Sequence, residues 1–382
     1  MFKANNTEGN GRQHRQTAPS RRNVLWLAGT YLGASLTGCV GSVPRRESTS
    51  EGVESGIDRV PETDIIATAN VNELLTDQGI KKLVNTWLDL ESNHTYYEGP
   101  SDFDEALGEI EDEIGLDPEK INEVTGLTDY DSSEVFDPQY AGGIISADWD
   151  TDDVVDAVDE SISELDEDSY EEETVYKPES DMGAWVWVLP NNSYVIGTEE
   201  AVKDTIDVLY GDTDTLDEAV RDAFRSQRSG LVTIAGNGPT ELISRQQTEQ
   251  TSDSLDIEVF RDIVTISGVF YRNEENRGVA VTLEAEDKGR AEDIANAIDE
   301  AIEYTRDVLT ESTGPVSESF YAELDEIEFK QNGAAIDISY KSTIDELETL
   351  ITDVYEQETA VASLVPGFSK SQGTVLMPGG FP

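Results

Sequence analysis

Apolar residues recur along this chain with two different periods. Short segments in which apolar residues alternate with polar ones or run continuously, bounded by turn residues, predict strands. Segments in which apolar residues recur every three or four positions predict helices. The strands expected from this pattern are 65–69, 140–147, 172–177, 184–189, 193–197, 230–235, 262–271, 278–286, 324–330 and 334–340. The helices expected are 71–90, 117–126, 151–165, 198–209, 216–224, 288–309 and 343–354.

Turn and cap residues support this division. Asn332-Gly333 between two strand patterns is a signal for a type I′ hairpin, and Thr343 with Glu346 forms a capping-box pattern. Hairpins that alternate with single helices indicate an α+β fold, in which helices pack on one face of antiparallel sheets.

The chain divides into two such modules after a linker. Residues 237–256 are rich in Gln, Thr, Ser and Asp, so we expect a first α+β domain at 59–240 and a second at 257–358. Residues 359–382 contain no acidic residue and several prolines and glycines. They predict a disordered or extended tail, and a docking peptide for a partner is the alternative interpretation.

Charge changes the picture more than any motif. The 382 residues include 81 Asp and Glu against 26 Lys and Arg, for a formal net charge of -55 spread along nearly the whole length. At molar salt the Debye length falls to roughly 3 Å, which screens repulsion between surface carboxylates. The composition therefore indicates a halophilic protein. It also argues against a nucleic-acid partner, because phosphate binding needs clustered Lys and Arg.

The first 39 residues have the pattern of an export signal. Arg21 and Arg22 precede an uncharged stretch at 24–38, which is too short to span a membrane and ends in Leu-Thr-Gly before Cys39. The arginine pair and the uncharged stretch resemble a twin-arginine export signal. The Leu-Thr-Gly sequence before Cys39 resembles the lipobox of prokaryotic lipoproteins. The chain thus resembles the exported surface lipoproteins of unknown function of haloarchaea.

This resemblance is limited to the signal segment, the lipobox and the acidic composition. It implies that residues 1–38 are a signal peptide, that Cys39 carries the lipid, and that 39–58 are a flexible tether. The protein would then lie outside the cell, on the outer face of the membrane. Because Cys39 is the only cysteine, no intramolecular disulfide can form.

No catalytic motif emerges from the rest of the chain. His94 is the only histidine after the predicted signal, and we interpret it as a loop residue. Gly236-Asn237-Gly238 begins like a dinucleotide loop but lacks the third glycine. The acidic runs that start at Asp129 and Asp212 lack the glycine and glutamate of an EF-hand loop, so we interpret them as solvated acid, with loose cation binding as the alternative. We expect no specific metal site and no cofactor.

A tryptophan pair and two glycosylation sequons could each have a specific function. Trp185 and Trp187 could form a sugar-stacking platform, but a strand apolar on both faces is typical of a core strand. Asn93 and Asn191 begin glycosylation sequons in predicted loops.

The sequence therefore predicts a lipid-anchored extracellular protein with a non-enzymatic binding or structural role in the cell envelope. Its partners would be the membrane, through Cys39, and an envelope protein. A solute-binding lipoprotein of a transporter and a carboxylate-based hydrolase remain as alternatives.

Overall fold

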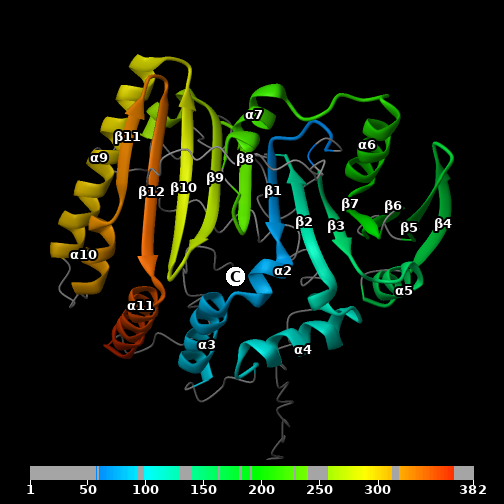
Figure 1. Cartoon of the computed structure of the whole chain (residues 1–382), viewed down its shortest axis with the longest axis horizontal. Helices are drawn as coiled ribbons and strands as arrows, with labels where there is room; N and C mark the ends of the chain where they lie inside the picture. The colour runs from blue at the N-terminus through cyan, green and yellow to red at the C-terminus, as the bar shows by residue number, and fades with distance from the viewer. Residues whose placement is uncertain are drawn as a thin grey trace, which may run out of the picture.

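The structure is a computed structural model that describes residue 57 and residues 60–92, 99–129, 140–161, 164–179, 183–189, 192–227, 229–239, 257–311 and 318–364. Within this part of the chain, one antiparallel sheet of 12 strands is flanked by helices (Figure 1). The α+β class predicted from the sequence is confirmed.

The strands follow one another in an open sheet. In chain order they are β1 (Ile65–Asn70), β2 (Ile121–Thr128), β3 (Ala141–Ala147), β4 (Leu165–Tyr170), β5 (Glu173–Pro178), β6 (Trp185–Leu189), β7 (Ser193–Gly197), β8 (Val232–Asn237), β9 (Ile263–Asn273), β10 (Asn276–Ala285), β11 (Glu328–Asn332) and β12 (Ala335–Thr343). Across the sheet the order is β11-β12-β10-β9-β8-β1-β2-β3-β7-β6-β5-β4. The edges are therefore β11 and β4.

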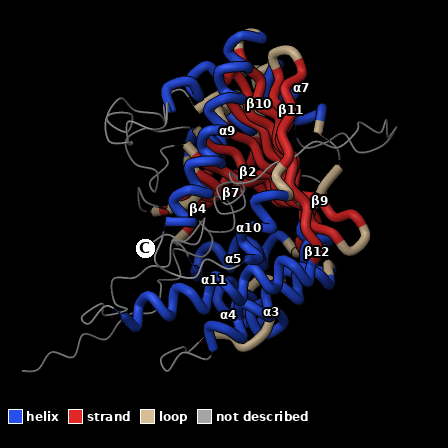
Figure 2. The backbone as a smooth tube through the Cα atoms, turned by 90° about the vertical axis from the view of Figure 1, so that its left-hand side faces the viewer, coloured by secondary structure: helices blue, strands red, loops and turns tan. Residues whose placement is uncertain are grey.

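Helices lie beside the sheet and along one end of its strands. They are α2 (Val71–Thr76), α3 (Gln78–Ser92), α4 (Phe103–Ile114), α5 (Thr151–Ser161), α6 (Glu199–Tyr210), α7 (Glu218–Ser226), α9 (Lys288–Glu311), α10 (Glu318–Asp325) and α11 (Ile344–Leu364), with 3-10 turns η2 (Pro118–Lys120) and η3 (Ile257–Asp262). Figure 1 shows α3, α4 and α11 at one end of the strands, while α9 and α10 lie next to β11. Seen from the side, α9 lies against the strand layer (Figure 2).

The two faces of the sheet carry different helices. On the half formed by β9 to β12, α9 buries Ile294 against Ile336 and Ile338, as expected for helices grouped on one face. On the other half, β6 is covered on both faces: Trp187 packs against α6, and Val186 packs against α5. Because successive side chains of a strand point to opposite faces, this continuously apolar strand needs a helix on each side.

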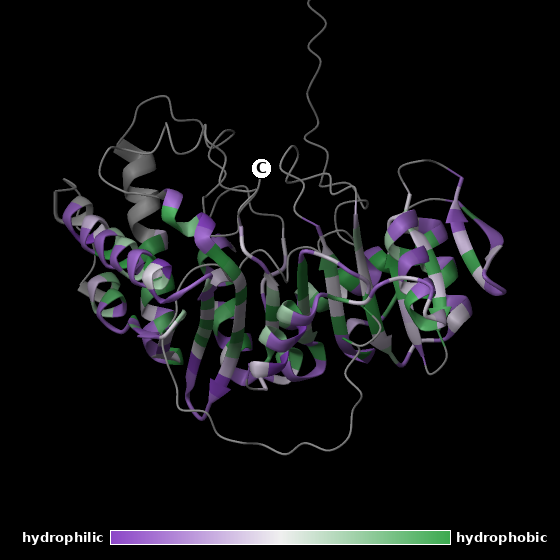
Figure 3. Ribbon diagram, turned by 90° about the horizontal axis from the view of Figure 1, so that it is seen from above, coloured by the Kyte–Doolittle hydropathy of each residue, from purple (hydrophilic) through white to green (hydrophobic). Residues whose placement is uncertain are grey.

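Apolar residues concentrate on the strands and on the inward faces of the helices (Figure 3). Trp187 is 1% exposed, which confirms that this strand belongs to the core. The interpretation of Trp187 as part of a sugar-stacking platform is thus excluded by its burial under α6.

Several predicted helices differ from the helices in the structure. The pattern at 71–90 forms two helices, because Asp77 ends α2 and its carboxylate accepts a hydrogen bond from the Ile80 amide at the start of α3. The helix predicted at 151–165 ends at Ser161, and Leu165 begins β4. The helix predicted at 117–126 is wrong.

The segment after Asp117 shows how a local cap signal can be overridden. The Asp117 side chain does accept a hydrogen bond from the Glu119 amide, and Pro118 follows it as the first helical residue. The helical turn nevertheless stops at Lys120, and β2 then pairs with both β1 and β3. Pairing on both sides and burial of Val124 and Leu127 outweigh the local preference for helix.

The hairpin of β11 and β12 turns one residue later than predicted. Asn332 is the last residue of β11 and pairs with Ala335, so the two turn residues are Gly333 and Ala334. Only Gly333 of these two has a positive φ, of 69°. A positive φ at the first turn position alone is typical of a type II′ turn rather than the predicted type I′ turn.

Strand pairing continues across the predicted boundary between the two modules. β8 of the first module pairs with β9 of the second, from Val232 opposite Phe270 to Asn237 opposite Thr265. The modules therefore share one sheet. In addition, α11 continues to Leu364, past the predicted start of the tail at residue 359. None of the described helices is long and apolar enough to cross a membrane.

Candidate functional site

The residues that the sequence singled out for export, lipid attachment and glycosylation lie outside the described part of the chain. They are Arg21, Arg22, Cys39, Asn93 and Asn191, and His94 lies outside it as well. The residue after the second acceptor, Asn192, has a positive φ of 57°, and its carbonyl accepts a hydrogen bond of 3.1 Å from the Ala147 amide.

The glycines around Asn237 serve strand packing. A Cβ on Gly238 would lie 1.6 Å from the Ile263 carbonyl oxygen, and one on Gly236 would lie 2.6 Å from that of Asp64. Both glycines thus allow close approach of neighbouring backbone, which accounts for the Gly-Asn-Gly pattern without a dinucleotide.

Acidic side chains meet at the end of the sheet where β1 begins and β2 ends. The Asp129 carboxylate accepts hydrogen bonds of 3.1 Å from the Thr63 hydroxyl and from the Asp64 amide. The Asp64 carboxylate in turn accepts one of 2.9 Å from the Asn237 side chain. Tyr140, at the start of β3, lies at the same end, and its carbonyl accepts from the Thr128 hydroxyl at 3.1 Å.

The electrostatics of this cluster disfavour ionisation. Burial raises the pKa of Asp129 and outweighs the hydrogen bonds that it accepts, and the negative charges of Asp64 and Asp204 add to the effect. Burial and the neighbouring Asp207 and Glu200 likewise raise the pKa of Asp204, on α6.

Tyr140 lies between these acids. Its hydroxyl oxygen is shielded from solvent and makes no well-formed hydrogen bond among the described residues. Burial raises its pKa, and the nearby Asp204 and Asp129 raise it further. The three groups of this cluster therefore hold their protons more tightly than the same groups do in water.

Other chemistry has less support in the described ranges. No group of three or more His, Cys, Asp or Glu in them is arranged to hold a metal ion. The acidic run from Asp212 to Asp214 connects α6 to α7, and its backbone pairs with Asp207 and Glu62. The sequence indicated Asp129 only as the start of a calcium loop, because its partners Thr63 and Asp64 lie 66 and 65 residues away.

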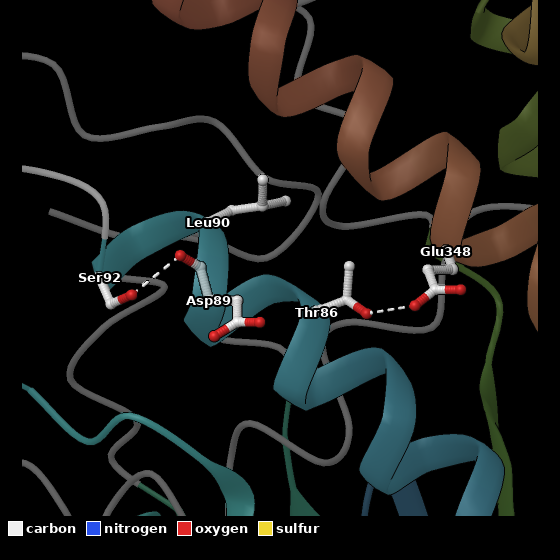
Figure 4. A pocket seen from close by; sticks show the side chains of 5 residues that line it. All are labelled: Thr86, Asp89, Leu90, Ser92 and Glu348. Carbon is white, nitrogen blue, oxygen red and sulfur yellow. Dashed lines mark hydrogen bonds between the residues drawn. The ribbon is translucent and has the colours of Figure 1, made fainter.

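A shallow hollow lies between α3 and α11. It is lined by Thr86, Asp89, Leu90, Ser92 and Glu348 (Figure 4). Two of its polar groups are already paired: the Thr86 hydroxyl donates to Glu348 at 2.8 Å, and the Ser92 hydroxyl donates to the Asp89 carbonyl at 2.9 Å. The hollow is thus a seam between α3 and α11 that the hydrogen bond from Thr86 to Glu348 crosses.

A buried ion pair next to this seam was not predicted from the sequence. The side chains of Asp77 and Arg277 are 1% and 7% exposed, and the Arg277 guanidinium donates to the Asp77 carboxylate. Arg272 contacts the second Asp77 oxygen at 3.5 Å. The pair joins the α2–α3 junction to the tip of the β9–β10 hairpin. Its only sequence signal is an acid at a helix start, which predicts a cap and not a buried partner.

Comparison with known proteins found solved structures of low similarity. No protein-family model matches the chain, and no curated protein matches it. Among solved structures, crystal form III of TP0453 is similar with a TM-score of 0.40 and 10% identity, over 78% of this chain and 97% of that one. Crystal form I of TP0453 gives 0.39 and 10%, over 79% and 98%.

Proposed function

We propose that this protein is an extracellular lipoprotein, held on the outer face of the cell membrane by lipid on Cys39, whose α+β body binds a partner in the cell envelope without catalysing a reaction. The observation that carries the proposal is the order of Arg21-Arg22, an uncharged stretch and Leu-Thr-Gly before the only cysteine. Each feature has its own role in export or lipidation, and all fall within twenty residues.

The way the chain enters the body is consistent with a tether. Ile57 and Val60 are 2% and 0% exposed, in a core with Val220 of α7 and Ala201 of α6. Pro61 then pairs with Thr215 as an isolated bridge. Ile57 near the end of the predicted tether and Val60 just after it are thus fixed in the core, so a lipid at Cys39 would hold the whole folded part of the protein.

The test is Cys39→Ser in the producing cell, followed by detergent partitioning and intact-mass measurement. The wild-type protein should partition into detergent and lack residues 1–38. Each buried methylene of the lipid contributes about 0.8 kcal/mol to membrane binding, so loss of the lipid should release the variant into the medium or leave it uncleaved at the membrane. Ser42→Ala, three residues further on, is the matched control and should behave as the wild type.

Membrane-bound Cys39→Ser protein with the mass of the mature wild type would contradict the anchor.

The binding role has a separate test, because cross-linking on intact cells should join the body to an envelope protein in the wild type. A body that forms no cross-link at the cell surface would argue against a partner while leaving the anchor intact.

A further inference from the structure

The β4–β5 hairpin lies at one edge of the sheet, opposite β11 (Figure 1). Its two strands pair with each other over six positions, from Leu165 opposite Pro178 to Tyr170 opposite Glu173. Its pairing with β6 covers only two, Val175 opposite Trp187 and Tyr176 opposite Val186. Backbone pairing thus holds the hairpin together better than it holds the hairpin to the sheet.

The hairpin is strongly acidic. Its carboxylates between residues 164 and 179 are Glu164, Asp166, Glu167, Asp168, Glu171, Glu172, Glu173 and Glu179. The only cation in that segment, Lys177, pairs within the hairpin with Asp168 at 2.7 Å. Lys177 also interacts with the charge of Glu199 on the neighbouring helix, so it is the single cation that the hairpin offers against the acids of that helix.

That helix, α6, is also acidic and offers a single cation. It carries Glu199, Glu200, Asp204 and Asp207 beside Lys203. The Lys203 ammonium lies 5.2 Å from the centre of the Tyr170 ring of β4 and 5.1 Å from that of the Trp185 ring of β6. Lys203 thus bridges the hairpin, the sheet and the helix, and it also pairs with Glu199.

Hydrogen bonds from the same stripe of α6 complete the contact. The Tyr170 hydroxyl donates to Asp207 at 3.0 Å, and the Tyr210 hydroxyl donates to Glu173 at 2.5 Å. Asp207 lies four residues after Lys203, and Tyr210 lies three residues after Asp207. These spacings place all three residues on one face of the helix. The carboxylates of Asp207 and Glu173 thus both lie in the contact between α6 and the β4–β5 hairpin, two elements that are already acidic.

The turn of the hairpin is unfavourable by itself. Glu171 and Glu172 have φ angles of 45° and 70°. Non-glycine residues rarely adopt this left-handed region, and hairpin turns that require it usually contain Asn and Gly. Two adjacent glutamates also repel each other, and repulsion of this kind grows as salt is removed.

We propose that the β4–β5 hairpin is a flap controlled by ionic strength. It docks on α6 through Lys203 when salt screens the carboxylates on both sides, and it leaves α6 when salt is lowered, before the rest of the sheet unfolds. Apart from the buried side chain of Val175, the hairpin is held by two register pairs, one bridging lysine and hydrogen bonds to carboxylates, and its acidic turn is strained, so its docking is sensitive to screening. Release exposes Trp185 and the edge of β6.

Hydrogen exchange of the whole purified chain in detergent, read by mass spectrometry from about 1 M down to about 0.1 M NaCl, tests this. Amides of β5 should lose protection at a higher salt concentration than amides of β1, in the middle of the sheet. Emission from Trp185 should shift with the β5 amides, and Trp185→Phe identifies its share of the signal.

Variants of the bridge and of the turn make the test specific. Lys203→Met should speed exchange of β5 amides roughly five- to thirtyfold at molar salt. Lys203→Arg should restore protection because a guanidinium also stacks on rings. Lys82→Met, which removes a lysine paired with Asp345 and Glu348 at the seam of α3 and α11, is the matched control and should leave β5 unchanged.

Glu171→Asn combined with Glu172→Gly should extend docking to lower salt, because it relieves the turn and removes two charges. The flap is ruled out if β5 and β1 lose protection at the same salt concentration. It is equally ruled out if Lys203→Met exchanges as the wild type does.

Discussion

Single residues tie together parts of this chain that are far apart in sequence, and Asp77 is the main example. Its carboxylate accepts from the Ile80 amide at 2.9 Å, which caps α3, and it pairs with Arg277. The Arg277 guanidinium also donates to the carbonyl oxygens of Glu274 and Asn276. Removal of one partner would leave the other charge buried, which is the costly way to break an ion pair.

We therefore expect Asp77→Asn to lower the free energy of unfolding by about 3–5 kcal/mol at molar salt. Glu73→Gln, which changes the half-exposed partner of Arg272, should cost no more than about 1 kcal/mol. Denaturant unfolding followed by circular dichroism measures both. Equal effects of the two variants would show that the buried pair contributes no more than the exposed one.

The same pair predicts a pH dependence. Burial alone would raise the pKa of Asp77, but hydrogen bonds from Arg277 and the Ile80 amide outweigh burial, so its pKa lies below the usual 3.8. Its contribution to stability is therefore complete above about pH 4 and is lost as the pH falls through the lowered value. Acid titration of the wild type should show this loss, and Asp77→Asn should lack it.

Close packing around the pair gives a third prediction at this scale. A Cβ on Gly79 would lie 2.6 Å from Arg277 Nη2 and 2.6 Å from Ile344 Cδ1, so Gly79→Ala should destabilise the protein by about 1–3 kcal/mol. Gly108→Ala is the control, because nothing lies within 4 Å of its Cβ, and inside α4 it should stabilise by up to about 1 kcal/mol. Thermal unfolding distinguishes them, and a stabilising Gly79→Ala would disprove this packing.

At the scale of elements, predictions succeeded where local and distant forces agree. The hairpin of β9 and β10 turns at the predicted Asn-Glu-Glu-Asn, and the helix after Thr198 is capped by that residue as expected. The strand β4 was missed because Asp166, Glu167 and Asp168 face solvent on an edge and leave no alternation of apolar residues. The acid cluster around Asp129 was missed for a related reason: strand order, which the sequence does not reveal, brings it together.

The capping box of α11 is an element whose energy can be measured. The Thr343 hydroxyl accepts from the Glu346 amide at 3.2 Å, and the Glu346 carboxylate accepts from the Thr343 amide at 2.9 Å. Thr343→Ala should cost about 1 kcal/mol. Thr349→Ala, one turn further into α11, should be neutral or slightly stabilising, since alanine is the better helix former. If both variants unfold at the same denaturant concentration, the cap does not stabilise α11.

At the scale of the whole molecule, the sequence predicted two modules and the structure joins them. The boundary pattern at 237–256 marks a long connection, but composition cannot show that β8 and β9 on either side of it become neighbours. The seam between α3 and α11 joins the halves again, through Lys82 with Asp345 at 2.7 Å and Glu348 at 3.0 Å. Contacts at so great a sequence separation have no local signal, so the shared sheet could not be predicted from the sequence.

Charge is the property of the whole molecule that should govern its stability. Within the described residues, ion pairs such as Lys81 with Asp104 neutralise few of the 81 acidic side chains, and a net charge of -55 remains on the chain. At about 0.1 M salt the Debye length is about 10 Å, so neighbouring carboxylates repel each other across the surface.

We expect residues 58–358 to lose structure as salt is lowered from molar to about 0.1 M, which circular dichroism along a dialysis series would measure. Sucrose, which favours compact states without screening charge, should rescue the fold far less than NaCl. A spectrum that stays unchanged at low salt would show that the acidic surface is not an adaptation to salt.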